Sequence, residues 1–248
     1  MKSRFLLFTA LSLCCLAAVA ANETAPAKIK IILVGDSTVN DRTGWGAGFK
    51  TFLTDQAVCI NTAANGRSSK SFINEGRWTN ALALKGDYYL IQFGHNDEPG
   101  KGPDRETQPE TTYRANMERY VDDTRTIGAK PVLVTSLVRR SWDKNGDGKI
   151  TSSLVPYVNV VKEIAAEKHV PLVDLHASSQ ALCEQLGQLK CNELSARITA
   201  TNAVDKVDNT HLNAKGSVVF AKLVVTGLAQ AVPELAPCLK TVEAAGGK

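Results

Sequence analysis

The sequence lacks any block of Lys and Arg, and no stretch of it interleaves basic with aromatic residues. Its 29 basic residues are nearly balanced by 25 acidic ones, which gives a formal net charge of +4. Such a chain carries no electrostatic footprint for binding a phosphate backbone. It also lacks the glycine-rich G-x-G-x-x-G and Walker loops that cradle nucleotide phosphates. We therefore expect no nucleic-acid partner and disfavour a flavodoxin-like nucleotide binder.

Long apolar runs are also absent beyond residue 20, so no later segment is expected to span a bilayer. The N-terminus differs, because Lys2 and Arg4 precede an apolar run that ends in Ala18-Val19-Ala20, the small-x-small pattern of a signal-peptidase site. We expect residues 1–20 to be a signal peptide and the protein to be secreted or periplasmic. After removal of this leader we expect no membrane partner and a monomer.

Cysteine is scarce, with six residues in the chain. Cys14 and Cys15 lie in the leader and would also suit a lipoprotein, but Leu13 stands where a small residue should precede a lipidated cysteine. The other four cysteines would enter an oxidising compartment, where three disulfide connectivities are open to them. We favour a disulfide between Cys183 and Cys191, which bracket a short loop. No C-x-x-C or Cys/His spacing of the kind that binds zinc is present.

Short β-branched runs bounded by turn signals alternate with segments of helical periodicity. This alternation predicts a parallel sheet covered on both faces, and right-handed crossovers then give a three-layer α/β/α sandwich of the flavodoxin-like type with strand order 2-1-3-4-5. The expected strands are Ile29 to Val34, Ala57 to Ile60, Tyr88 to Phe93, Pro131 to Thr135 and Val170 to Val173. The expected helices are Thr112 to Ile127, Ser153 to Lys168 and Ala214 to Leu228. We assign residues 27–235 to one domain and residues 236–248 to a flexible tail.

Polar residues follow several of these strands, at the sheet edge where α/β proteins bind ligands. Ser37 follows the first strand and is a candidate nucleophile, or else the cap of the next helix. Gly66 follows the second strand and can present a bare backbone N–H, and Asn96 follows the third and can donate an uncharged amide. Asp208 lies three residues before His211, within reach of its imidazole Nδ1.

These signals are weak singly, but their joint order resembles the SGNH, or GDSL-type, esterase superfamily. Within this superfamily, the motif residues are most similar to those of rhamnogalacturonan acetylesterases and related pectin or xylan acetylesterases. The blocks that carry this resemblance are Gly35-Asp-Ser-Thr-Val, Gly44-Trp-Gly, Asn65-Gly-Arg-Ser-Ser, Gly86-Asp-Tyr, Ile91-Gln-Phe-Gly-His-Asn-Asp and Thr210-His-Leu.

The resemblance implies the SGNH hydrolase fold and a serine esterase that removes acetyl groups from plant cell-wall polysaccharide, most closely rhamnogalacturonan or pectin. In this interpretation Ser37 is the nucleophile, His211 the base and Asp208 its orienting acid. The N–H groups of Ser37 and Gly66, with the Asn96 amide, would form the oxyanion hole. No cofactor is required. An acetylxylan esterase, a lysophospholipase or thioesterase of the same superfamily, and a non-catalytic carbohydrate-binding module are the alternatives.

Other residues are candidates for contacts to substrate or metal. We expect Trp45, Trp78, Arg67 and His95 to contact the polysaccharide. Asp143, Asn145 and Asp147 match the first half of a calcium-binding loop, but the twelfth position is Leu154 instead of a bidentate Glu, which favours a solvated turn. Arg139 and Arg140 either contact a carboxylated substrate or are solvated.

Overall fold

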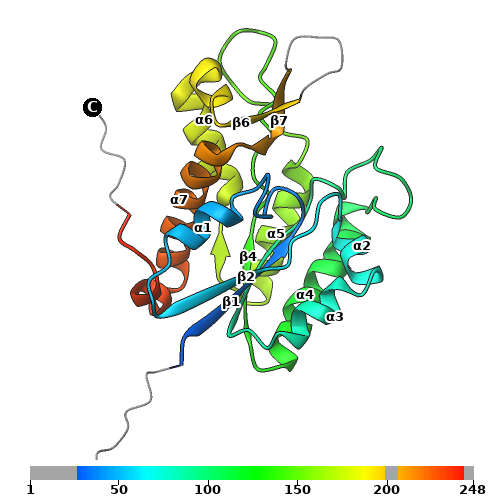
Figure 1. The fold of residues 1–248 in the computed structure, drawn as a ribbon. Coiled ribbons are helices and arrows are strands. Elements are labelled where there is room, and N and C mark those ends of the chain that lie inside the picture. Colours follow the sequence, from blue (N-terminus) through cyan, green and yellow to red (C-terminus); the bar gives the residue numbers. More distant parts are fainter. Residues whose placement is uncertain (1–26, 199–205, 243–248) are drawn as a thin grey trace, which may run out of the picture.

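A parallel five-stranded sheet forms the centre of the computed structural model, which describes residues 27–198 and 206–242 (Figure 1). Its strand order is β2-β1-β3-β4-β5, as predicted. The strands are β1 (Ile29–Gly35), β2 (Ala57–Asn61), β3 (Tyr88–Gln92), β4 (Lys130–Val134) and β5 (Leu172–Val173). The first four lie within a residue or so of their expected bounds, and β5 is shorter than expected.

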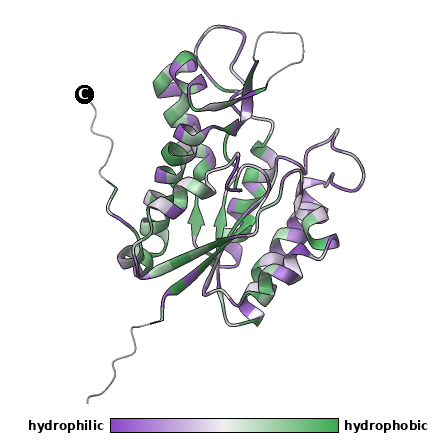
Figure 2. Cartoon of the chain, in the orientation of Figure 1, coloured by the Kyte–Doolittle hydropathy of each residue, from purple (hydrophilic) through white to green (hydrophobic). Residues whose placement is uncertain are grey.

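Side chains of β1 alternate between two cores, because successive residues of a strand point to opposite faces of the sheet. Ile31 and Leu33 enter one hydrophobic cluster, and Ile32 and Val34 enter the other. All four are fully buried. Figure 2 shows the strands as the most hydrophobic part of the ribbon, with polar residues concentrated on the outer helices and loops. A sheet that is apolar on both faces must be covered on both, which produces the three-layer α/β/α sandwich.

Helices cover both faces of the sheet (Figure 1). One face packs against the group α1 (Gly46–Thr51), α6 (Leu175–Asn192) and α7 (Ala214–Ala231). The other packs against the group α2 (Ser69–Asn74), α3 (Arg77–Ala83), α4 (Arg114–Thr126) and α5 (Val155–Glu167). The three helices expected from periodicity are present as α4, α5 and α7. A short π-helical segment, Pro109–Tyr113, precedes α4.

Side chains that suit N-caps begin several of these helices. Asn213 accepts a hydrogen bond from the Gly216 N–H at the start of α7, at 2.9 Å, and Asp174 caps α6 through the Ala177 N–H. Ser68 and Ser71 form a reciprocal capping box at the start of α2. Each cap satisfies a backbone donor that has no partner within its helix.

A second, two-stranded antiparallel sheet stands apart from the main one. It pairs β6 (Ser195–Ile198) with β7 (Lys206–Leu212) and was not expected from the sequence. β7 reads Lys-Val-Asp-Asn-Thr-His-Leu, whose polar residues gave no strand signal. In Figure 1 this hairpin lies beyond the sheet, beside α6.

The flexible tail predicted from residue 236 is wrong for its first residues. The 3₁₀-helix Pro233–Cys238 buries Cys238, and Leu239 pairs with Leu53 while the Lys240 N–H donates to the Phe52 carbonyl at 2.7 Å. These contacts hold the segment against the residues that join α1 to β2. Residues 243–248 and the predicted signal peptide lie outside the described residues. Among the described helices, none is long and apolar enough to cross a membrane.

Candidate active site

Ser37 lies just beyond the end of β1, where the chain turns sharply. Gly35 is required at this turn, because a Cβ there would come within 2.6 Å of the Gln92 carbonyl oxygen and of a Val39 methyl group. Asp36 shapes the next residues, since its Oδ1 accepts hydrogen bonds from the Thr38 N–H at 2.8 Å and the Thr38 hydroxyl at 2.7 Å. The Ser37 side chain is thereby presented at the carboxyl edge of the sheet, where ligands of α/β proteins bind.

A chain of hydrogen bonds joins Ser37 to His211, which is 174 positions away in the sequence, and through it to Asp208. The Ser37 Oγ lies 2.8 Å from His211 Nε2, and His211 Nδ1 lies 2.7 Å from Asp208 Oδ2. The other carboxylate oxygen of Asp208 accepts the backbone N–H groups of Thr210 and His211, at 2.8 and 3.0 Å. This geometry orients the imidazole so that Nε2 can take the hydroxyl proton, as the D-x-x-H spacing predicted.

The surroundings of Asp208 keep its carboxylate charged. Partial burial by itself raises the pKa of Asp208, but the hydrogen bonds from the His211 backbone and side chain and from Thr210 outweigh it and lower the pKa below its ordinary value. An ionised carboxylate can hold the Nδ1 proton of His211 and stabilise the imidazolium that forms when Ser37 is deprotonated.

The expected oxyanion donors lie on neighbouring loops. Gly66 has φ +70°, a left-handed conformation that favours glycine, and the Asn96 amide donates to the Arg67 carbonyl at 3.3 Å. That contact sets the Asn96 amide beside the Gly66–Arg67 segment. In the part of the chain that the structure describes, neither the Ser37 nor the Gly66 backbone N–H donates to another protein group. Both N–H groups can therefore donate to a developing oxyanion.

Asp97 ties two of these loops together and was missed by the sequence analysis. Its buried carboxylate accepts hydrogen bonds from the Ser69 N–H at 3.1 Å, the Ser69 hydroxyl at 2.6 Å and the Thr107 hydroxyl at 3.1 Å. It thus links the start of α2, just after Gly66, to the end of β3 beside Asn96. Burial raises the pKa of Asp97 to about 7, against the opposing effect of the hydrogen bonds from Ser69. Asp97 is the last residue of the Gly-His-Asn-Asp block, from which only Asn96 was predicted to support the chemistry.

His95 is buried, which contradicts its expected role as a substrate contact. It is 2% exposed, and its Nδ1 lies 3.6 Å from Asp36 Oδ2. His95 therefore packs in the core against Asp36, the residue that precedes Ser37. Burial alone raises the pKa of Asp36, but the facing imidazole of His95 and the hydrogen bonds from Thr38 lower it overall.

The two tryptophans predicted as sugar-stacking residues are also in the core. Trp45 is 0% exposed and donates its indole N–H to Gln92 Oε1 at 3.0 Å, and Trp78 is 1% exposed and donates to Asp123 Oδ2 at 2.9 Å. Neither ring is accessible to a sugar, so these predictions are wrong. Both rings fill the volume between sheet and helices that large aromatic side chains usually occupy.

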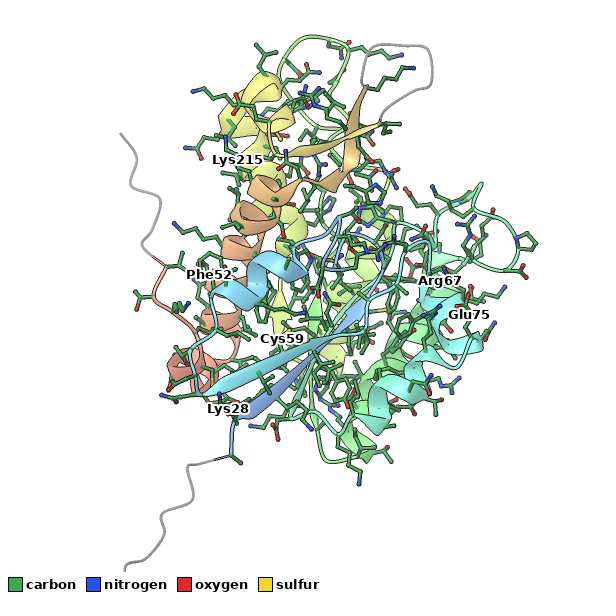
Figure 3. All side chains as sticks on the ribbon, viewed as in Figure 1. Lys28, Phe52, Cys59, Arg67, Glu75 and Lys215 are labelled. Atoms are coloured by element: carbon green, nitrogen blue, oxygen red, sulfur yellow. The ribbon has the colours of Figure 1, made fainter. Side chains whose placement is uncertain are left out.

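Arg67 keeps an exposed side chain beside the site. Its guanidinium Nε donates to Glu75 Oε2 at 2.9 Å, and both side chains are about one third exposed. Figure 3 shows the two labelled residues close together at the edge of the molecule, beside α2. Arg67 thus remains accessible from solvent next to Gly66.

The calcium-like loop is a set of tight turns. Asp143 Oδ1 accepts the Asn145 N–H at 2.9 Å, and Asp147 Oδ1 accepts the Lys149 N–H at 2.8 Å. Each of these Asx-turns uses one oxygen of its carboxylate locally. Across residues 27–198 and 206–242, no group of three His, Cys, Asp or Glu side chains is arranged to hold a metal ion.

An α/β sandwich that carries a Ser–His–Asp chain at the carboxyl ends of its strands defines a serine ester hydrolase. More narrowly, residues 33–218 match the GDSL-like Lipase/Acylhydrolase family, and the chain belongs to that family.

Comparisons with known proteins agree with this assignment. The chain is 37% identical over 214 residues to a rhamnogalacturonan acetylesterase of Bacillus subtilis, a match that covers 81% of this chain and 89% of the relative. It is 29% identical over 220 residues to a rhamnogalacturonan acetylesterase of Emericella nidulans, covering 77% and 81%. An acetylxylan esterase structure from Geobacillus stearothermophilus superimposes with a TM-score of 0.61 at 17% identity, covering 82% of this chain and 94% of that one. The last comparison supports the fold alone.

Proposed function

We propose that this protein removes acetyl groups from an acetylated pectic polysaccharide of the rhamnogalacturonan type, through an acyl-enzyme on Ser37. The observation that carries the chemistry is the continuous chain from the Ser37 hydroxyl through His211 to Asp208, with distances of 2.8 and 2.7 Å. The substrate class rests on the 37% identical relative from Bacillus subtilis, which is a rhamnogalacturonan acetylesterase.

The reaction follows from the position of each group. His211 Nε2 takes the Ser37 proton as the Ser37 oxygen forms a bond to the acetyl carbonyl carbon. The Ser37 and Gly66 N–H groups and the Asn96 amide stabilise the oxyanion. The imidazolium then gives its proton to the departing sugar oxygen as the ester bond breaks. Water repeats the cycle on the acetyl-enzyme and releases acetate.

The loop from Glu98 to Glu110 favours a short acyl group. It follows β3 beside the site and contains no large apolar residue, so it offers no wall for a fatty chain. Each buried methylene would contribute about 0.8 kcal/mol in a site built for long chains. We expect kcat/KM to fall from p-nitrophenyl acetate to butyrate to octanoate, and a rise toward octanoate would favour the lipolytic alternative.

The substrate is tested by acetate release from a panel of acetylated rhamnogalacturonan, homogalacturonan and xylan. We expect the highest kcat/KM on rhamnogalacturonan, with the Ser37→Ala variant as the inactive control. Faster release from xylan would favour the acetylxylan esterase alternative. Binding without release of acetate from any polymer would instead indicate a carbohydrate-binding module.

Export of the protein and oxidation of its cysteines belong to the same proposal. Cys183 and Cys191 are buried, and their Sγ atoms face one another at 2.7 Å, which supports a disulfide between them in an oxidising compartment. Mass spectrometry of the secreted protein after alkylation without reduction tests both points. We expect an N-terminus near residue 21 and a disulfide-linked peptide pair, whereas alkylated Cys183 and Cys191 would contradict the disulfide.

A further inference from the structure

Arg140 is a buried cation that the proposed mechanism does not use. It lies in the loop after β4 and is 3% exposed, packed with its guanidinium 5.9 Å from the centre of the Phe220 ring. Within residues 27–198 and 206–242 it forms no ion pair with a carboxylate. Our two interpretations from the sequence, a substrate contact and a solvated charge, are both wrong for this residue.

The hydrogen bonds of Arg140 converge on the segment that carries the acid and the base. Its Nη2 donates to the carbonyl oxygens of His211 at 2.7 Å and of Asp208 at 3.1 Å. Its Nη1 donates to the Thr210 carbonyl at 3.4 Å, and its backbone N–H donates to the Asn209 carbonyl at 2.8 Å. Every residue from 208 to 211 is therefore held by Arg140.

The Nε atom donates to the Ser195 hydroxyl at 3.0 Å, on the partner strand β6. Burying a guanidinium is costly unless its N–H groups are satisfied, and here neutral carbonyls satisfy them instead of a carboxylate. A planar fork with five donors can reach several carbonyls of one turn in a fixed geometry, whereas a lysine offers three rotatable donors on a single atom. This arrangement is suited to fixing a backbone geometry.

The segment needs such a support, because β7 pairs with β6 and not with the main sheet. Besides Arg140, the neighbouring Arg139 donates to the Thr210 hydroxyl at 2.7 Å, and the Leu212 N–H donates to the Thr43 carbonyl at 2.8 Å. Arg139 is also paired with Glu98. Among the side chains that the structure describes, Arg140 is one that donates to the backbone carbonyls of both Asp208 and His211.

We infer that Arg140 is a positioning residue for the esterase reaction, which holds the carbonyls of the Asp208–His211 turn so that the imidazole stays in hydrogen-bond range of Ser37. This inference rests on the proposed roles of Ser37, His211 and Asp208. It assigns Arg140 no contact with substrate. Its loss should affect turnover far more than substrate binding.

The test compares Arg140→Met, which keeps much of the volume but removes all side-chain donors, with Arg140→Lys, which keeps the charge without the fork. Arg125→Met is the control. Arg125 lies on the distant helix α4 and also donates to a backbone carbonyl, that of Lys168, at 2.7 Å. Each variant is assayed with p-nitrophenyl acetate and checked by thermal unfolding. Proton NMR then follows the His211 Nδ1–H signal, which reports its hydrogen bond to Asp208.

A displacement of about 1 Å at a catalytic group can cost on the order of 10²-fold in rate. We therefore expect about a 10²-fold lower kcat for Arg140→Met with KM changed by less than about 3-fold, a shifted or broadened Nδ1–H signal, and partial recovery in Arg140→Lys. Arg125→Met should resemble wild type in all three.

A folded Arg140→Met protein with wild-type kcat and an unchanged Nδ1–H signal would overturn the inference. If Arg140→Met does not fold, Arg140→Lys decides, because full activity in that variant would contradict a role for the fork. Absence of esterase activity in the wild type would refute the proposed function instead. The NMR comparison would still test whether Arg140 controls the His211–Asp208 geometry.

Discussion

Ser37 lies just beyond the end of β1, an interior strand of the five-stranded sheet, whereas Asp208 and His211 lie on β7, which pairs with β6 in a separate two-stranded sheet. The first region is held by strand register and by two hydrophobic cores. The second is held by hydrogen bonds from Arg139 and Arg140 to its backbone and to Thr210. Ser37 therefore lies against the buried centre of the fold, whereas Asp208 and His211 lie on an attached two-stranded sheet.

The two regions should respond differently to substitution. A polar substitution at the sheet end removes a chemical group without moving its neighbours, because the backbone there is fixed on both sides. A substitution on the hairpin changes the position of the imidazole as well as its chemistry.

Ser37→Ala should abolish esterase activity, because loss of a triad nucleophile typically lowers kcat by several orders of magnitude. The substitution removes one hydroxyl at the edge of the sheet and leaves both cores unchanged, so the unfolding temperature should match wild type. Hydrolysis of p-nitrophenyl acetate and thermal unfolding are measured on the same preparation. Near wild-type turnover would mean that another group is the nucleophile.

Asp208→Asn should lower kcat by about 10³- to 10⁴-fold, because an amide favours the wrong tautomer of His211 and cannot stabilise the imidazolium. Asp147→Asn is the control, since Asp147 is exposed in a distant Asx-turn. Steady-state kinetics on p-nitrophenyl acetate measure both variants. Preserved turnover in Asp208→Asn would point to a different orienting acid.

Asn96→Ala should reduce kcat by about 10²- to 10³-fold with a much smaller change in KM, as expected for a donor that acts on the transition-state oxyanion. The same kinetic assay separates the two constants. A change confined to KM would assign Asn96 to substrate binding and leave the oxyanion hole to the backbone donors.

Asp97 should affect the pH dependence of stability. Its pKa is raised from 3.8 to about 7 by burial, so between these values the folded protein retains a proton that the unfolded chain releases. The contribution of Asp97 to the free energy of unfolding is therefore greatest below the lower value and is lost as pH rises toward the upper one. Asp97→Asn cannot titrate and should remove this dependence.

Urea unfolding of wild type and Asp97→Asn at several pH values between about 4 and 8 measures it. The stability of wild type relative to the variant should decrease as pH rises. A relative stability that increases with pH would show that the folded protein holds Asp97 as a carboxylate throughout.

The sheet was predictable because its signals are local. The β-branched run from Ile29 to Val34 and the glycine that follows specify a buried strand and a turn within one short window. Ser37, Gly66 and Asn96 could be proposed as site residues because each lies in the loop that follows such a strand. The D-x-x-H spacing placed the Asp208 carboxylate within reach of His211 in the same way.

The parts that were not predicted depend on contacts between distant segments. Arg140 meets the Asp208–His211 turn about 70 positions away, and no local pattern separates it from a solvated arginine. Trp45 and Trp78 looked suited to sugars, because an aromatic near a motif has the same sequence signature whether it faces the site or the core. The β6–β7 hairpin has no apolar alternation because β7 carries the polar groups of the site.

The assignment of Ser37 as the nucleophile is tested most directly by inactivating the protein with an alkyl fluorophosphonate and mapping the modified residue by mass spectrometry. This reagent phosphonylates a serine whose hydroxyl is activated by a neighbouring base, as Ser37 is by His211 at 2.8 Å. We predict one adduct per chain on Ser37, loss of activity in proportion to its formation, and a much slower reaction in Asp208→Asn. Loss of activity with the adduct on another residue, or an active protein that does not react, would contradict the assignment of Ser37 as the nucleophile.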